Sequence, residues 1–232
     1  MPSMPDETVS TGTGAPQQGV LSRLSLIFDF DGTIADTLSA IVRLVNEHAK
    51  EINIKPLAET DVDELRGMSN LDIIKKYKVP LLKVPYLVLR AQKELNHRIG
   101  EMSLFPGVKE LVLDLKRWGI RLGILTSNSR ENVKKFLQAQ NLDVFDFIHA
   151  EQNFFGKNWA LLHLLKKFNL KKEEVIYVGD EVRDIEACQK VNIAVIAVSW
   201  GFHRRKLLQD KLPTYLVDSP DEIRAIVSDG RN

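Results

Sequence analysis

Short apolar runs alternate with amphipathic stretches over the second half of the chain. Five runs have the length of buried strands and end at polar or glycine-containing turns; they span residues 120–126, 147–150, 175–179, 193–198 and 215–217. Between them, apolar residues recur at helical spacing over residues 129–140, 158–168 and 182–190, and Ser219-Pro220 is a typical helix start. Strands that alternate with helices predict an α/β fold with a Rossmann-like three-layer core, in which helices cover both faces of a central parallel sheet.

A first strand precedes this region and is separated from it by a helical segment. Residues 24–28 form a short apolar run, whereas residues 36–103 show helical periodicity, punctuated by prolines, without a clear strand. We therefore predict a core of residues 21–35 and 104–232, with residues 36–103 inserted after the first strand as a helical cap. Residues 1–20 are rich in Ser, Thr, Gly and Pro, and we expect a disordered tail there.

Composition limits the class of protein. Hydrophobic residues make up 44% and charged residues 27% of the chain, and the formal net charge is +1, so we expect a soluble, cytoplasmic, globular protein. Basic clusters at residues 166–172 and 203–206 are balanced by acids, and no apolar run reaches membrane-spanning length. We therefore expect neither nucleic acid nor a membrane as a partner. The single cysteine excludes an intrachain disulfide, and the five histidines show no metal-ligand spacing.

Two carboxylates follow the first predicted strand. Asp29 and Asp31 stand two residues apart, so both point toward one side at the carboxyl end of the strand, where open α/β sheets bind ligands. Like charges held together need a cation or a shared proton, and Mg²⁺ prefers carboxylates together with phosphate oxygens. Taken alone, the stretch from Asp29 to Thr33 is equally compatible with a turn or a helix cap.

Further polar residues occupy the same edge of the predicted sheet. Thr126-Ser127-Asn128 follows a strand and precedes a helix, where hydroxyl and backbone N–H groups either bind phosphate or cap the helix. Lys157 opens a helix, where the helix dipole disfavours a cation. It is therefore either a surface lysine or a cation that neutralises phosphate and carboxylate.

A second pair of carboxylates follows the strand at residues 175–179. Asp180 ends that strand, and Asp184 lies one helical turn later, so the two side chains can approach one another. The pair suits a cation site, and the alternative is a capping residue followed by an acid in the first turn of the helix.

The order of these clusters is more specific than any one of them. It resembles the haloacid dehalogenase-like hydrolase superfamily and, within it, the phosphoglycolate phosphatase-like branch. The resemblance covers residues 24–218 and is strongest at 28–37, 123–128 and 175–187, and Ser199-Trp200-Gly201-Phe202 is also similar to that branch. The chain departs from the family at Lys157-Asn158, where a lysine–proline pair is common.

The resemblance implies a mechanism. Asp29 is the implied nucleophile that forms an aspartyl-phosphate, and Asp31 is the implied acid–base residue. The implied Mg²⁺ ligands are Asp29, Asp31 through its backbone carbonyl, and Asp180, with Asp184 in a direct or supporting role. The expected activity is Mg²⁺-dependent hydrolysis of a small phosphorylated metabolite, with phosphoglycolate as a family-level candidate.

Phosphate binding is implied for a second set of residues. Thr126 and Lys157 are expected to hold the phosphoryl oxygens, and the same role extends to Gly32, Thr33, Ser127 and Asn128. Arg66 lies in the predicted cap, in a stretch that continues to Asn70, and either binds a second anionic group of the substrate or has a structural role.

Three other functions are alternatives to the phosphatase. A phosphosugar mutase has the same two aspartates, and only the cap distinguishes it. A metal-free dehalogenase is disfavoured by four clustered carboxylates, and a non-enzymatic binding module is disfavoured by the balanced charge. The expected assembly is a monomer or a weak homodimer.

Overall fold

The computed structural model describes residues 24–50, 55–68, 70–77, 82, 90, 93–94, 98, 102–151 and 156–229. The predicted tail at residues 1–20, much of the second half of the predicted cap, and Ser69 lie outside the described residues.

In the part of the chain that the structure describes, six parallel strands form one sheet in the order β3-β2-β1-β4-β5-β6. The strands are β1 (Ser25–Phe28), β2 (Arg121–Thr126), β3 (Phe147–Ala150), β4 (Val175–Gly179), β5 (Ala194–Val198) and β6 (Tyr215–Val217). Phe28, the last residue of β1, lies beside Ile124 of β2 and Val178 of β4. The central position of β1 therefore brings the residues that follow β1, β2 and β4 to one edge of the sheet. The predicted α/β fold with a parallel sheet is confirmed.

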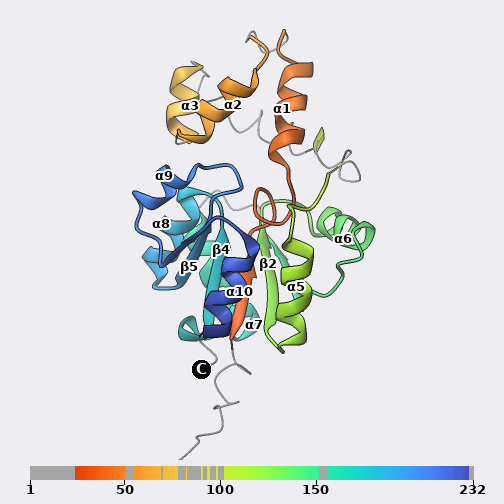
Figure 1. Ribbon diagram of the computed structural model, residues 1–232, viewed down its shortest axis with the longest axis vertical. Helices are drawn as coiled ribbons and strands as arrows, with labels where there is room; N and C mark the ends of the chain where they lie inside the picture. The colour runs from red at the N-terminus through yellow and green to blue at the C-terminus, as the bar shows by residue number, and fades with distance from the viewer. Residues whose placement is uncertain are drawn as a thin grey trace, which may run out of the picture.

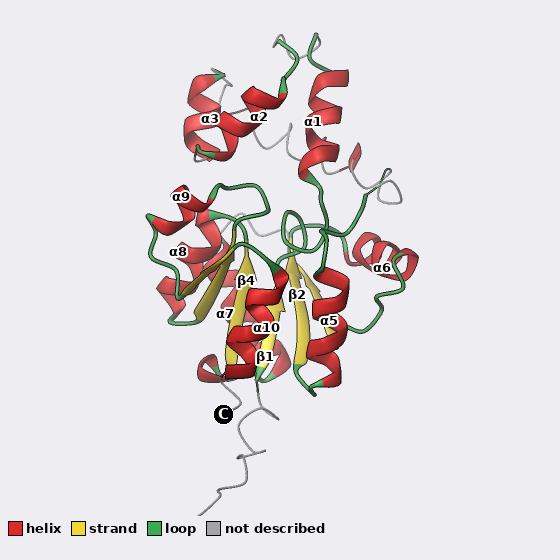
Figure 2. Ribbon diagram, in the orientation of Figure 1, coloured by secondary structure: helices red, strands yellow, loops and turns green. Residues whose placement is uncertain are grey.

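Helices cover both faces of the sheet (Figures 1 and 2). The helices of the core are α5 (Val108–Arg117), α6 (Arg130–Ala139), α7 (Lys157–Phe168), α8 (Val182–Val191), α9 (Arg205–Gln209) and α10 (Pro220–Asp229), with a 3₁₀ turn, η4 (Lys172–Glu174).

Alternating strand residues serve two separate apolar layers. Leu26 and Phe28 of β1 belong to the layer with buried residues of α5, α6 and α10. Ile27, between them, belongs to the other layer, with buried residues of α7, α8 and α9. Successive side chains of a strand point to opposite faces, so a strand buried on both faces is mainly apolar. In β1, all four residues are buried, and the three that follow Ser25 are apolar.

In the described part of the predicted cap, helices lie beyond the carboxyl ends of the strands (Figure 1). They are α1 (Leu38–Glu47), α2 (Glu59–Arg66) and α3 (Asn70–Lys76). The two connections between the cap and the core, around residues 34–36 and 103–105, lie side by side. The N–H of Asp36 donates to the carbonyl of Ser103 (2.9 Å), and the N–H of Phe105 donates to that of Ile34 (3.1 Å). The helices are thus tethered directly above the end of β1, and the exact division into core and cap stays a prediction.

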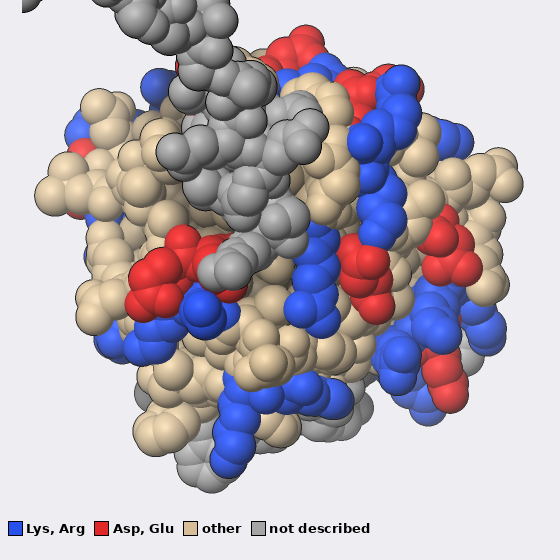
Figure 3. Space-filling model, turned by 90° about the horizontal axis from the view of Figure 1, so that it is seen from below, with Lys and Arg blue, Asp and Glu red and all other residues tan. Residues whose placement is uncertain are grey.

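Charges of both signs alternate over the surface at the opposite end of the molecule. Figure 3 shows Lys and Arg side chains lying among Asp and Glu side chains on that face. Among the described residues, none of the helices combines the length and the apolar character needed to cross a membrane.

Candidate active site

A tight turn after β1 shapes the centre of the site. The N–H of Asp29 still donates to the carbonyl of Val178 in β4 (2.8 Å), and the chain then folds back so that the N–H groups of Ile34 and Ala35 both donate to the carbonyl of Phe30 (3.0 Å each). Gly32 has a φ of +78°, and a Cβ there would collide with the carboxylate of Asp180. The turn therefore requires glycine at position 32.

Three buried carboxylates meet at this edge of the sheet. Oxygen atoms of Asp29, Asp180 and Asp184 lie within 4.8 Å of one another, and the exposed fractions of these residues are 4%, 0% and 0%. Lys157, the first residue of α7, forms ion pairs with both Asp29 and Asp184. If all four groups are ionised, three negative charges face one positive charge, so the group can accept a divalent cation. An all-oxygen ligand set of this kind fits Mg²⁺.

Hydrogen bonds orient each carboxylate. Asp180 accepts from the Thr33 hydroxyl (2.8 Å) and from the backbone N–H of Phe202 (2.7 Å). Asp184 accepts from the N–H of Glu181 at the start of α8 (2.9 Å), and Asp29 accepts from the N–H of Phe30 (2.8 Å). The oxygens that converge on the centre are therefore held before any ligand binds, a requirement for a preorganised site.

Burial and the repulsion between neighbouring acids raise the pKa of Asp29, Asp31 and Asp180. Burial is the main cause that brings the pKa of Asp29 to about 6, against the attraction of Lys157. The pKa of Asp31 rises to about 7, through burial and then the charge of Asp29. Burial and the neighbouring acids also place the pKa of Asp180 well above its ordinary value. An acid with the pKa of Asp31 can both give and take a proton near neutral pH.

Lys157 stays charged in spite of its surroundings. Burial alone would lower its pKa, but the carboxylates of Asp184 and Asp29 raise it above the ordinary value. Its ammonium group also lies 5.1 Å from the centre of the Tyr177 ring, and that ring is fully buried. The unfavourable interaction of this cation with the dipole of α7 is thus offset by two carboxylates and an aromatic ring.

The polar residues after β2 form a second side of the same edge. The Thr126 hydroxyl accepts from the N–H of Asn128 (2.9 Å), and the Asn128 side chain accepts from the N–H of Ser129 (2.7 Å). The helix cap of α6 is Ser129, whose hydroxyl accepts from the N–H of Asn132 (3.2 Å). Thr126 and Asn128 are buried, and Ser127 is partly exposed. Since Ser129 caps α6, the alternative role of helix cap is filled by the residue after this cluster.

Arg66, at the end of α2, contacts the core. Its guanidinium donates to the backbone carbonyls of Gly201 (3.0 Å) and Ser199 (2.9 Å), and its own carbonyl accepts from the N–H of Arg204 (2.8 Å). The loop that it contacts is the one whose Phe202 N–H binds Asp180. These contacts favour the structural alternative over the direct substrate contact.

The structure adds residues to the predicted site, and it leaves the carboxylate of one predicted residue outside the acidic cluster. Tyr177 and the Phe202 amide were not predicted from spacing, because an aromatic strand residue and a backbone N–H carry no sequence signature of a site. His203 is also buried, and its Nδ1 accepts from the first N–H of α8, that of Val182 (2.9 Å). Among the described residues, the carboxylate of Asp31 is not part of the clustered group, so its part in metal binding, through the backbone carbonyl, stays a prediction.

Comparison with known proteins identifies the family. Residues 26–198 match the model of the haloacid dehalogenase-like hydrolases. The chain is 36% identical to phosphoglycolate phosphatase of Synechococcus elongatus, over 88% of this chain and 97% of the relative. It is 26% identical to pyrophosphatase PpaX of Bacillus mycoides, over 88% and 96%.

A solved structure supports the fold. A predicted phosphatase from Clostridium acetobutylicum superposes with a TM-score of 0.75 at 21% identity, over 89% of this chain and 99% of that one. The predicted resemblance and the predicted class of enzyme, a phosphatase, are thereby confirmed. The chain belongs to the haloacid dehalogenase-like hydrolase family, in its phosphoglycolate phosphatase-like branch.

Proposed function

We propose that the protein is a Mg²⁺-dependent phosphomonoester hydrolase that works through an aspartyl-phosphate on Asp29. The observation that carries the proposal is the group of three buried carboxylates around one lysine, at the sheet edge where a phosphate would bind. Phosphoryl transfer requires mainly positioning and neutralisation of charge, and this group supplies both. The identity to a phosphoglycolate phosphatase makes phosphoglycolate the first substrate to test.

Asp29, Asp180 and the backbone carbonyl of Asp31 would hold the metal ion, with Asp184 as a direct or supporting ligand. When bound, Mg²⁺ would lower the repulsion between a carboxylate nucleophile and an anionic phosphate. Lys157 contributes to the same neutralisation and binds the phosphoryl oxygens together with Thr126. Gly32, Thr33, Ser127 and Asn128 follow β1 and β2 at the same edge of the sheet, and they are the further proposed phosphate contacts.

The two aspartates divide the chemistry. A carboxylate oxygen of Asp29 attacks phosphorus, the bond from phosphorus to the alcohol oxygen breaks, and Asp31 gives its proton to the departing alkoxide. Asp31, now ionised, takes a proton from water as that water attacks phosphorus. Inorganic phosphate leaves, and the Asp29 carboxylate and the protonated Asp31 are restored. A pKa of about 7 for Asp31 suits both halves of this cycle.

Removal of divalent metal is expected to abolish phosphate release. EDTA should reduce hydrolysis of both p-nitrophenyl phosphate and phosphoglycolate to background, and excess Mg²⁺ should restore it, because the uncompensated acids repel the substrate. Colorimetric detection of phosphate measures both. Full activity in EDTA would contradict the proposed metal dependence, and interconversion of phosphosugars without phosphate release would favour the mutase.

Arg66→Ala is expected to lower kcat/KM by roughly tenfold on both p-nitrophenyl phosphate and phosphoglycolate. The reason is that Arg66 donates to carbonyls of the loop that positions Asp180, so its loss disturbs the site for every substrate. Steady-state kinetics on the two substrates, with Arg43→Ala on the exposed side of α1 as a control, measure the effect. A loss confined to phosphoglycolate would instead show that Arg66 binds the second anionic group of the substrate.

A further inference from the structure

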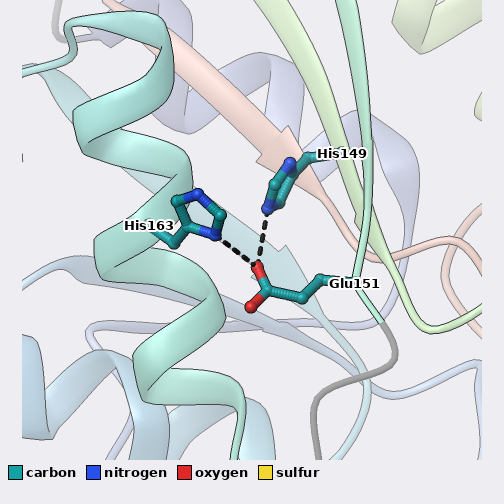
Figure 4. A group of neighbouring side chains, drawn as sticks. All are labelled: His149, Glu151 and His163. Atoms are coloured by element: carbon teal, nitrogen blue, oxygen red, sulfur yellow. Dashed lines mark hydrogen bonds and ion pairs between the residues drawn. The ribbon is translucent and has the colours of Figure 1, made fainter.

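Two histidines and a glutamate converge at the edge of the sheet, in a group separate from the acidic centre. Figure 4 shows that His149 and His163 each direct one ring nitrogen at the same carboxylate oxygen of Glu151. The distances to that oxygen are 2.7 Å from Nε2 of His149 and 3.2 Å from Nδ1 of His163. The two rings meet edge to face, with centroids 5.2 Å apart.

The strand β3 and the helix α7 bring these side chains together. His149 lies in β3, Glu151 follows directly after that strand, and His163 lies on α7, which packs in the layer next to the sheet. His149 and Glu151 are close in sequence, and the packing of α7 beside β3 adds His163 to them.

The spacing of the three atoms resembles that of ligands around one metal ion. Zinc binds imidazole nitrogen and carboxylate oxygen at about 2.0–2.2 Å, so neighbouring ligand atoms of a tetrahedral site lie roughly 3.3 Å apart. Here the candidate ligand atoms of the three residues lie within 4.8 Å of one another. Shifts on the order of 1 Å would bring them to the tetrahedral separation.

The burial of the side chains also suits a metal ligand set. The side chain of His149 is 4% exposed and that of Glu151 is 15% exposed, whereas His163 is 60% exposed. A fourth position can therefore open toward water on the side of His163.

We propose that His149, Glu151 and His163 form a binding site for a transition-metal dication of the zinc class. Two imidazoles and one carboxylate prefer Zn²⁺, Co²⁺ or Ni²⁺ over Mg²⁺, which prefers oxygen ligands alone. The site is thus chemically distinct from the carboxylate centre. A bound ion would join the end of β3 to α7, the helix whose first residue is Lys157, and would restrict the movement of that helix against the sheet.

The surroundings of His149 set the expected strength of binding. A ligating histidine usually donates its other ring N–H to an acceptor, but Nδ1 of His149 is buried without a hydrogen-bond partner among the described residues. Loss of such an outer partner weakens metal affinity by about 10–100-fold in known sites. We therefore expect moderate affinity, as for a reversible or regulatory ion.

Titration of the intact protein with Zn²⁺ and Co²⁺, in a large excess of Mg²⁺, tests the site. The excess Mg²⁺ occupies the carboxylate centre, so the remaining binding reports the mixed nitrogen and oxygen site. We expect one equivalent of Zn²⁺ by calorimetry, a visible absorption spectrum typical of tetrahedral Co²⁺, and a higher Tm with Zn²⁺.

His163→Ala and Glu151→Gln are the deciding variants. Because His163 is largely exposed, its variant is expected to fold, and each variant should weaken Zn²⁺ binding by more than about 100-fold, since it removes a direct ligand. His48→Ala is the matched control, because His48 also pairs with a carboxylate, that of Glu94 (3.0 Å). Equal Zn²⁺ binding by all variants, or none by the unaltered protein, would overturn the proposal and leave the three residues as a hydrogen-bonded cluster.

Discussion

Asp29→Asn is expected to abolish turnover, with a loss of at least about 10⁴-fold in kcat, because an amide does not replace a carboxylate as a nucleophile toward phosphorus. Asp29 is 4% exposed and shares Lys157 with Asp184. The variant removes one of three crowded negative charges and leaves Lys157 with its other partner. The fold should therefore persist, so that the loss is chemical.

Initial rates with phosphoglycolate and p-nitrophenyl phosphate measure this effect, and circular dichroism verifies folding. Asp36→Asn provides the control, since Asp36 lies just beyond the same turn and its side chain accepts hydrogen bonds from Ser39. A folded Asp29→Asn protein with more than roughly a tenth of normal kcat would remove Asp29 from the role of nucleophile.

Asp31→Asn is expected to lower kcat on phosphoglycolate by roughly 10²–10⁴-fold, the usual contribution of a general acid–base residue. The amide preserves the size of the side chain and removes the titratable proton of the carboxyl group. The half-buried position and raised pKa of Asp31 are those of a group that donates and accepts protons near neutral pH.

The choice of leaving group sharpens that experiment. Nitrophenolate leaves without protonation more readily than an aliphatic alkoxide does, so formation of the aspartyl-phosphate from p-nitrophenyl phosphate should suffer less. Rapid-quench kinetics separate this burst from the later hydrolysis, which still needs Asp31 to activate water. Equal losses in both burst rates would mean that Asp31 acts by positioning the turn instead.

Much of the fold was predictable because the inner strands of the sheet are mostly buried and apolar, as in β4 and β5. The predicted ranges 147–150, 175–179 and 215–217 coincide with β3, β4 and β6. Buried parallel strands appear in the sequence as mainly apolar runs that end at glycine or polar residues. Short elements with few apolar residues were not predicted, and α9 (Arg205–Gln209) buries only Leu208.

The site was partly predictable for the same reason. Carboxylates that follow adjacent parallel strands must meet at one edge, and the structure brings Asp29 and Asp180 together with Asp184. The hydrogen bond from Thr33 to Asp180 was not predictable in this way. These residues follow β1 and β4, which become neighbours only through the order of strands in the sheet. The convergence of His149 and His163 on Glu151 likewise depends on how α7 packs against β3, which residue spacing does not encode.

Trapping the phosphoenzyme is the most direct test of the proposed chemistry. Protein is mixed with phosphoryl-labelled substrate and Mg²⁺, quenched in acid within the first turnover and divided into two samples. One sample is digested at low pH, and mass spectrometry locates the phosphoryl label. The other is reduced with borohydride, which releases the phosphate of an acyl-phosphate and marks the modified aspartate as homoserine. We predict label on Asp29, its loss when unlabelled substrate is added before the quench, and no label in Asp29→Asn. Label on Ser127 or on a histidine, chased at the rate of turnover, would contradict the aspartyl-phosphate mechanism.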